Sequence, residues 1–208
     1  MITIYRAPYS TNCERVGLAL ARKGLGAESI VISYEDRSAV EQVSGQGLVP
    51  VIVDEGRVIS DSRAILRHLD EREPEPALYP AGVSKRAELD LFCDWFDEVW
   101  KLEPNEIEAE LELPQPDMER VERLGAVVAG RLGIFERLLA DRDFLWGEEL
   151  SAADLVAFPF LKYARGRDPH DPDLFHRVID EHQPLGPEHP RLSAWIERVD
   201  ALPRAFGP

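Results

Sequence analysis

Residues 47–71 read GLVPVIVDEGRVISDSRAILRHLDE, and their pattern sets the fold of the first part of the chain. Two short apolar runs lie on either side of Gly56, which is typical of a β-hairpin whose tight turn uses the glycine. After the hairpin, residues 61–71 carry apolar side chains three and four positions apart, which predicts a helix. These apolar helix positions are Ile65, Leu66 and Leu69. The segment is therefore expected to form a hairpin followed directly by a helix.

The residues before this segment add a strand, a helix and a second strand. Residues 1–5 are typical of a strand, and residues 11–24 follow helical spacing up to Gly24, a residue type that often ends helices. Residues 29–33 form the second predicted strand. A strand–helix–strand unit followed by a hairpin and a helix predicts a mixed four-stranded sheet, which is the order of elements in the thioredoxin-like fold.

Prolines recur between residues 74 and 82, where neither a helix nor a strand can continue. We therefore predict an α/β domain at residues 1–73, a linker at 74–82 and a second domain at 83–208. The second domain has only helical patterns. Its helices are predicted at 84–103, ended or kinked by Pro104, at 117–140, and after a capping box formed by Ser151 and Asp154.

The composition limits the kinds of partner that we expect. The chain has 208 residues, a net charge of −15 and 44% hydrophobic residues, which suits compact domains with a core. It has no apolar run long enough to span a membrane and no signal-peptide pattern at its first residues, so we expect a cytoplasmic protein. The acidic excess argues against nucleic acid and membrane surfaces as partners. Residues 1–73 carry only −2 of this charge, so the first domain can receive an anionic ligand.

The cysteines and histidines predict no metal site. Cys13 and Cys93 are the only cysteines, too few for a disulfide scaffold and without the paired spacing of a zinc site. His170, His176 and His182 are six residues apart, a spacing that scatters side chains around a helix axis. We therefore expect both cysteines to be reduced thiols.

Three short motifs fall in one order within the first seventy residues. They are Ser10-Thr11-Asn12-Cys13 after the first strand, Val49-Pro50 before the hairpin, and Asp61-Ser62 at the start of the helix. Taken singly, each motif is typical of an ordinary helix N-cap or strand start. Their order and spacing carry the functional interpretation.

With these motifs the chain resembles the serine-type members of the glutathione transferase superfamily over nearly its whole length. The resemblance rests on YRAPYSTNCERVGLALARKGL at residues 5–25, the quoted segment 47–71, LWGEELSAADLVAF at 145–158, and HPRLSAWIERVDALP at 189–203. It implies a thioredoxin-like domain followed by an all-helical domain, usual homodimerisation, and conjugation of glutathione to a small hydrophobic electrophile. The helical domain is expected to contribute the electrophile pocket.

The resemblance implies that Ser10 stabilises the glutathione thiolate. A hydroxyl that donates a hydrogen bond to the sulfur favours the anion without losing its own proton. Thr11 is a rival donor at the same turn. Cys13 offers a redox alternative, because a thiol in the first turn of a helix can form a mixed disulfide with glutathione. The simpler interpretation of Cys13 is a small buried residue that faces the sheet.

The other two motifs are expected to bind the glutathione backbone. The resemblance implies a cis peptide at Val49-Pro50, which leaves the Val49 backbone free to pair with the tripeptide. Asp61 can face the ammonium group of the γ-glutamyl end, and Ser62 with the free N–H groups of its helix can hold the carboxylate. The glycyl carboxylate has no obvious lysine or histidine. Arg37 and Gln46 are the candidates for it.

We therefore predict a cytoplasmic glutathione transferase with glutathione as co-substrate and no metal. The first alternative is a glutathione-linked thiol/disulfide reductase or dehalogenase that depends on Cys13. The second is a non-catalytic binding module of the same fold. The proline-rich segment 166–186 is expected to cover the pocket between the domains. Four aromatic residues are candidates for its wall or for core packing, namely Tyr9, Trp95, Trp100 and Tyr163.

Overall fold

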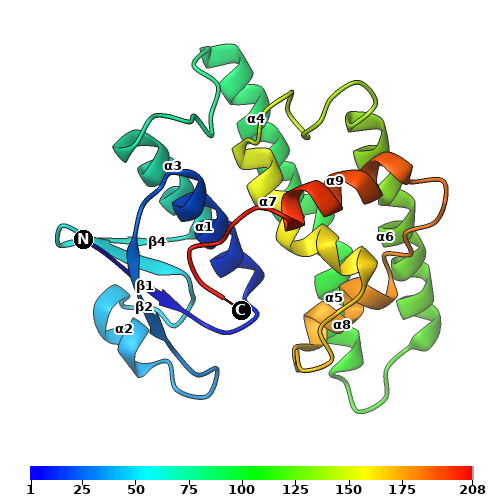
Figure 1. Ribbon diagram of the computed structural model, residues 1–208. Coiled ribbons are helices and arrows are strands. Elements are labelled where there is room, and N and C mark those ends of the chain that lie inside the picture. The colour runs from blue at the N-terminus through cyan, green and yellow to red at the C-terminus, as the bar shows by residue number, and fades with distance from the viewer. Residues whose placement is uncertain (208) are drawn as a thin grey trace. The chain divides into compact units, whose positions relative to one another are not determined.

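The computed structural model describes residues 1–207 and begins with a four-stranded sheet of order β2-β1-β3-β4 (Figure 1). Strand β2 runs parallel to β1, whereas β3 is antiparallel to β1 and β4 is antiparallel to β3. The strands are β1 at Ile2–Arg6, β2 at Ala27–Val31, β3 at Val51–Asp54 and β4 at Arg57–Ser60. The predicted mixed sheet is confirmed, although β2 lies two residues earlier than the predicted 29–33.

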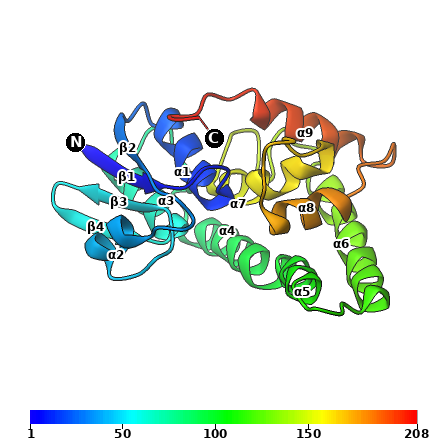
Figure 2. The same ribbon diagram turned by 90° about the horizontal axis from the view of Figure 1, so that it is seen from below.

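Three helices flank this sheet: α1 at Thr11–Arg22, α2 at Ser38–Ser44 and α3 at Ser62–Arg72. Helix α2 packs through Val40 on the sheet face that carries Val51 and Tyr5. Helices α1 and α3 pack against each other, and the two ribbon views show them on the other side of the sheet (Figures 1 and 2). Alternate residues of each strand therefore serve two different helical layers.

The hairpin turn has the geometry that its sequence predicts. Glu55 and Gly56 both have positive φ angles, 51° and 83°. Positive φ at both central residues is the mark of a type I′ turn, whose twist matches that of the flanking strands. The turn thereby fixes the register in which Asp54 pairs with Arg57 and Val51 with Ser60.

A buried ion pair joins the C-terminal ends of α1 and α3. The Lys23 ammonium lies 2.6 Å from Asp70 Oδ1 and its side chain is fully buried. Lys23 also donates to the Pro76 carbonyl at 2.7 Å, and Asp70 accepts from the Leu78 N–H at 2.7 Å. The pair thus ties the proline-rich segment after α3 to the sheet domain.

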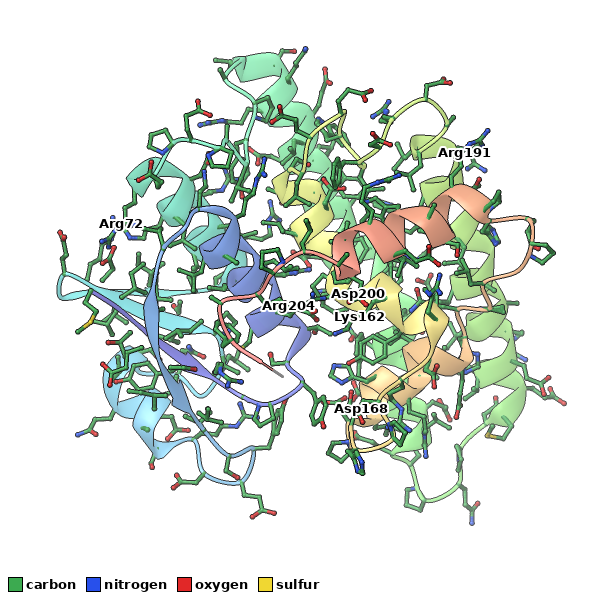
Figure 3. All side chains as sticks on the ribbon, viewed as in Figure 1. Arg72, Lys162, Asp168, Arg191, Asp200 and Arg204 are labelled. Carbon is green, nitrogen blue, oxygen red and sulfur yellow. The ribbon has the colours of Figure 1, made fainter. Side chains whose placement is uncertain are left out.

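The chain divides into two compact units, and the second of them spans Gly82–Ala201. The first unit contains Met1–Ala81 and also residues 202–207, which the sequence analysis had placed with the helical domain. In this unit the Ala205 N–H donates to the Gly17 carbonyl at 3.0 Å, and Arg204 pairs with Glu14 at 3.0 Å (Figure 3). These contacts fasten the segment 202–207 along α1.

The second unit is all helical, as predicted. Its helices are α4 at Val83–Trp95, α5 at Leu102–Leu111, α6 at Met118–Leu138, α7 at Ala152–Leu161, α8 at Leu174–Glu181 and α9 at Pro190–Asp200. Every residue of α7 is buried, so α7 is the centre of this unit. Within residues 1–207, no helix combines the length and the apolar character needed to cross a membrane.

The helix predicted at 84–103 is interrupted. A π-helical turn at Phe96–Trp100 follows α4, and Pro104 lies in the first turn of α5 rather than at the end of a helix. In a first turn the missing proline N–H costs no intrahelical hydrogen bond. Arg131 of α6 donates to the Val99 carbonyl at 2.8 Å and pairs with Glu103, so a distant helix satisfies the backbone at the break.

The capping box predicted at the start of α7 is confirmed. The Asp154 carboxylate accepts from the Ser151 N–H at 2.9 Å. It also accepts from the Leu145 N–H at 2.7 Å and from the Trp195 indole N–H at 2.9 Å. A single buried carboxylate therefore joins α7 to the preceding loop and to α9.

Two glycines of α6 allow a matched test of this packing. A Cβ on Gly125 would lie 2.3 Å from His182 Nδ1, whereas a Cβ on Gly130 would meet nothing within 4 Å. We expect Gly125→Ala to lower the free energy of unfolding by about 1–3 kcal/mol, because the added methyl forces His182 to move. Gly130→Ala should raise it by about 0.5–1 kcal/mol through helix propensity. Urea unfolding of both variants measures the difference, and equal effects would contradict the contact with His182.

A second test concerns the segment 202–207. The Phe206 ring lies against Gly17, where a Cβ would approach the ring to 3.0 Å, and the Arg6 guanidinium stacks over the ring at 4.8 Å. We expect Gly17→Ala to destabilise the protein by about 1–3 kcal/mol in the wild-type background. In the Phe206→Ala background the same change should be neutral or stabilising, because the ring is gone. A double-mutant cycle by urea unfolding measures this coupling, and additivity would contradict the contact.

Candidate functional site

The register of the sheet brings the three motifs to one edge. Tyr5 near the end of β1 pairs with Val51 at the start of β3, and Val51 also pairs with Ser60 at the end of β4. The residues just beyond these pairs are therefore neighbours at the same edge. They are the turn that leads to Ser10, the Val49-Pro50 motif and the Asp61-Ser62 motif.

Ser10 is the N-cap of α1. Its Oγ accepts a hydrogen bond from the Cys13 N–H at 3.3 Å, and the side chain is half-buried. A hydroxyl has two acceptor lone pairs and one proton, so capping uses a lone pair and not the proton, which can be donated to a sulfur. Thr11 is the first residue of α1 and is buried, with 6% of its surface exposed. Of these two candidates, Ser10 is therefore the one that is partly exposed.

Cys13 is a buried thiol. It is 2% exposed, and burial raises its pKa above the ordinary value for cysteine. A hydrogen bond from the Ser10 hydroxyl, another from the Ala7 backbone N–H, and the positive charges of Arg6 and Arg37 act in the opposite direction with smaller effect. The thiol is therefore protonated at neutral pH, and it fits the simpler interpretation of a small core residue.

The Val49-Pro50 peptide bond is cis, as the resemblance implies. Pro50 is buried directly before β3, and Val49 packs against the cluster under α2. Leu48, which precedes them, is 75% exposed. The motif therefore forms the entry to β3 at the edge where Ser10 lies.

Asp61 and Ser62 open α3. The Asp61 carboxylate accepts from the Ala64 N–H at 2.9 Å, while the Asp61 backbone has a φ of 75°. Positive φ is sparsely populated for residues with a side chain and costs of the order of 1–3 kcal/mol, and such residues cluster at functional sites. Ser62 is 5% exposed, and its Oγ accepts a hydrogen bond from Arg15 Nη1 at 3.2 Å.

Arg15 is a site residue that the sequence analysis did not identify. It lies on α1 one turn after Ser10 and is 1% exposed. The available signal was a charged residue at the start of the otherwise apolar run Arg15-Val16-Gly17-Leu18-Ala19-Leu20. A buried charge in such a run requires polar partners.

Arg37 and Gln46 brace the loop that precedes β3. The Arg37 guanidinium donates to the Gly47 carbonyl at 2.9 Å and stacks over Tyr34 at 4.9 Å. The Gln46 amide donates to the Leu48 carbonyl at 3.0 Å and accepts from the Leu48 N–H. Both candidates for the glycyl carboxylate thus already make contacts within the protein.

In the second unit, two of the proposed pocket aromatics belong to the core. Trp100 is fully buried and stacks on Phe96 at 4.5 Å. Tyr163 is 4% exposed, stacks on His176 at 4.8 Å and donates to the Asp171 carboxylate at 2.9 Å. Asp171 also bonds His176 Nδ1 at 2.9 Å, so a buried polar network anchors part of the segment 166–186 within this unit.

Comparison with known proteins identifies the family of the chain. The chain matches the model of the glutathione S-transferase N-terminal domain over residues 4–77 and that of the C-terminal domain over residues 118–198. It is 32% identical over 183 residues to a maleylacetoacetate isomerase of Pseudomonas aeruginosa, covering 80% of this chain and 81% of the relative. The chain belongs to the glutathione S-transferase superfamily.

The chain is also similar to two further proteins. The FtsZ-localized protein A of Caulobacter vibrioides is 30% identical over 171 residues, covering 76% of this chain and 75% of the relative. The crystal structure of a glutathione S-transferase from Rhodospirillum rubrum superposes with a TM-score of 0.77 at 26% identity, covering 97% of this chain and 88% of that one. The chain is thus similar both to a glutathione S-transferase and to a protein named for its localization with FtsZ.

The burial of Cys13 predicts a slow and strongly pH-dependent reaction with iodoacetamide. In a Cys93→Ala background, we expect Cys13 of the folded protein to react at least about tenfold more slowly at neutral pH than free glutathione, because the thiolate is the reactive form. The rate should keep rising with pH above the ordinary thiol pKa, because burial raises the pKa of Cys13, and unfolding in guanidinium should abolish the protection. Mass spectrometry of the alkylated protein measures it. Fast alkylation at neutral pH would support the redox alternative instead.

Proposed function

We propose that the protein is a glutathione transferase that joins the glutathione thiolate to a small apolar electrophile, with Ser10 as the thiolate stabiliser. The observation that carries this proposal is the meeting of three motifs at one sheet edge. Two helices, α1 and α3, also begin there. A helix N-terminus favours bound negative charge, so the edge suits a ligand with both a thiolate and a carboxylate.

Each motif has a part of glutathione that it can bind. The Val49 backbone at the entry to β3 can pair with the tripeptide as a short added strand. The Asp61 carboxylate can face the γ-glutamyl ammonium group. The Ser62 hydroxyl and the first N–H groups of α3 can hold the γ-glutamyl carboxylate. With the tripeptide held at these two points, its cysteine sulfur is expected to lie beside Ser10.

The energy that Ser10 can supply matches the task. A free thiol with a pKa of about 8.5 is mostly protonated at neutral pH, and lowering the pKa by about two units requires about 2.7 kcal/mol. A hydrogen bond to a charged group contributes about 1.5–3 kcal/mol, and a helix N-terminus about 0.3–1 kcal/mol. The thiol proton passes to solvent, and the sulfur attacks the electrophilic carbon to form a sulfur–carbon bond. With an aryl halide the carbon–halogen bond then breaks and the halide leaves.

Positive charges near this sheet edge also favour a bound thiolate. Arg6 and Arg37 both favour the anionic form of the neighbouring Cys13 thiol. A glutathione thiolate bound at the turn that carries Ser10 would experience positive potential of the same origin. Arg37 thereby supports binding of an anionic ligand while its guanidinium braces the loop through Gly47.

Two alternative functions remain. The burial of Cys13 and its raised pKa disfavour a reductase or dehalogenase that depends on this thiol. The similarity to a protein named for its localization with FtsZ favours a non-catalytic binding module as the second candidate. By resemblance we further propose a cytoplasmic homodimer with a detoxifying role and without nucleic acid or membrane partners.

Calorimetric titration with glutathione tests the ligand and its binding site. We expect the wild type to bind glutathione with micromolar-to-millimolar affinity, and the double variant Asp61→Ala, Ser62→Ala to lose this binding because the γ-glutamyl anchor is removed. Binding that survives the double variant would contradict the assigned site. A wild type that binds no glutathione would overturn the transferase assignment and favour the binding module.

Ser10→Ala tests the chemistry rather than the binding. We expect the variant to bind glutathione nearly as well as the wild type, while the pKa of the bound thiol rises by about one to two units through loss of the hydroxyl donor. Ultraviolet absorbance of the bound thiolate against pH measures this shift, and kcat/KM with a small aryl halide should fall by about ten- to a hundredfold. Thr11→Ala is the matched control, and a larger effect there would transfer the role to Thr11.

A further inference from the structure

We propose that Arg15 is a positioning residue that orients the Ser62 hydroxyl toward the carboxylate of the γ-glutamyl end. This inference rests on the proposed function and adds a residue to it. Arg15 Nη1 lies 3.2 Å from Ser62 Oγ, and the two side chains come from different helices, α1 and α3. Both residues are buried, with 1% and 5% of their surfaces exposed.

The donor inventory fixes the direction of this hydrogen bond. A guanidinium has N–H donors and no acceptor, so Ser62 Oγ must accept from Arg15. The single hydroxyl proton of Ser62 therefore points elsewhere. A serine inside a helix usually returns this proton to the carbonyl four residues earlier, but Ser62 is the first residue of α3 and has no such helical carbonyl. Its proton is thus available to an acceptor at the helix N-terminus.

The charge of Arg15 strengthens the same preference. The Arg15 guanidinium donates to the Ser62 oxygen, so its positive charge lies behind the hydroxyl that would face the ligand. A hydroxyl that accepts from a cation becomes a better donor, because hydrogen bonds in a chain polarise one another. Arg15, Ser62 and the first N–H groups of α3 then form one donor group that selects a carboxylate.

Arg15 also links the two halves of the ligand site. It lies on α1, the helix that Ser10 caps, and it contacts the first residue of α3, the helix that Asp61 caps. A ligand held at both helix starts depends on their separation. The buried contact between Arg15 and Ser62 fixes that separation where the ligand would bind.

The proposal predicts selective loss of one ligand. We compare glutathione with γ-aminobutyryl-cysteinyl-glycine, which keeps the amino group of the first residue and lacks only its α-carboxylate. Deaminated glutathione, which keeps that carboxylate and lacks the amino group, is the control. Arg15→Met should weaken glutathione and the deaminated control by about ten- to a hundredfold, because a charge-assisted contact is lost. The dissociation constant of the γ-aminobutyryl analogue should change by no more than about twofold, because this ligand has no carboxylate for the contact.

Combined variants distinguish positioning from general damage. Ser62→Ala should reproduce the selective loss, and the double variant Arg15→Met, Ser62→Ala should be no weaker than Ser62→Ala alone, because both changes act through one hydroxyl. Arg15→Lys keeps the charge without the planar fork of donors. Its dissociation constant for glutathione should lie between those of the wild type and Arg15→Met. Arg22→Met, the same substitution type at the other end of α1, should leave every dissociation constant unchanged.

The calorimetry can contradict either the positioning role of Arg15 or the proposed function. Equal weakening of the carboxylate ligands and the γ-aminobutyryl analogue by both Arg15→Met and Arg15→Lys would overturn the positioning role, as would additive losses in the double variant. Carboxylate preference that survives Arg15→Met would overturn it too. A wild type that binds none of the three ligands would instead overturn the proposed function, and this inference with it.

Discussion

The site depends on the register in which β3 pairs with β1 and β4. Because successive residues of a strand point to opposite faces, a slip of one residue would exchange Ile52 and Val51 between the two helical layers. The same slip would move the Val49-Pro50 entry along the edge, away from the turn of Ser10. The type I′ turn at Glu55 and Gly56 holds the hairpin in register and so keeps the three motifs together.

Polar contacts then fix how α1 and α3 lie on the sheet. Apolar packing alone tolerates small rotations of a helix, whereas a buried charge is stable only with its partners in place. The Lys23–Asp70 ion pair joins the two helices at their C-terminal ends, and the Arg15–Ser62 hydrogen bond joins them at their N-terminal ends. Together these contacts hold both helix starts at the sheet edge, where their free N–H groups can face one ligand.

Local sequence patterns were sufficient for elements whose partners are near in the chain. The hairpin around Gly56 and the Ser151–Asp154 capping box follow from residues within a few positions, and both were predicted. The break before α5 was not, because Arg131 of α6 satisfies the exposed carbonyls there. The docking of residues 202–207 on Gly17 and the burial of Arg15 equally depend on contacts across the sequence, which spacing along one helix does not reveal.

Ser10 shows why a structural and a chemical role need not compete at this turn. Capping uses a lone pair of the hydroxyl oxygen, whereas thiolate stabilisation uses its proton, so one side chain can do both. At Cys13 the structural role and a redox role do compete. Burial suits a core residue but raises the thiol pKa, whereas redox chemistry needs a lowered pKa. A binding module would keep the cap and the fold without using the proton. The use of that one proton therefore separates a transferase from the other two functions that this scaffold can support.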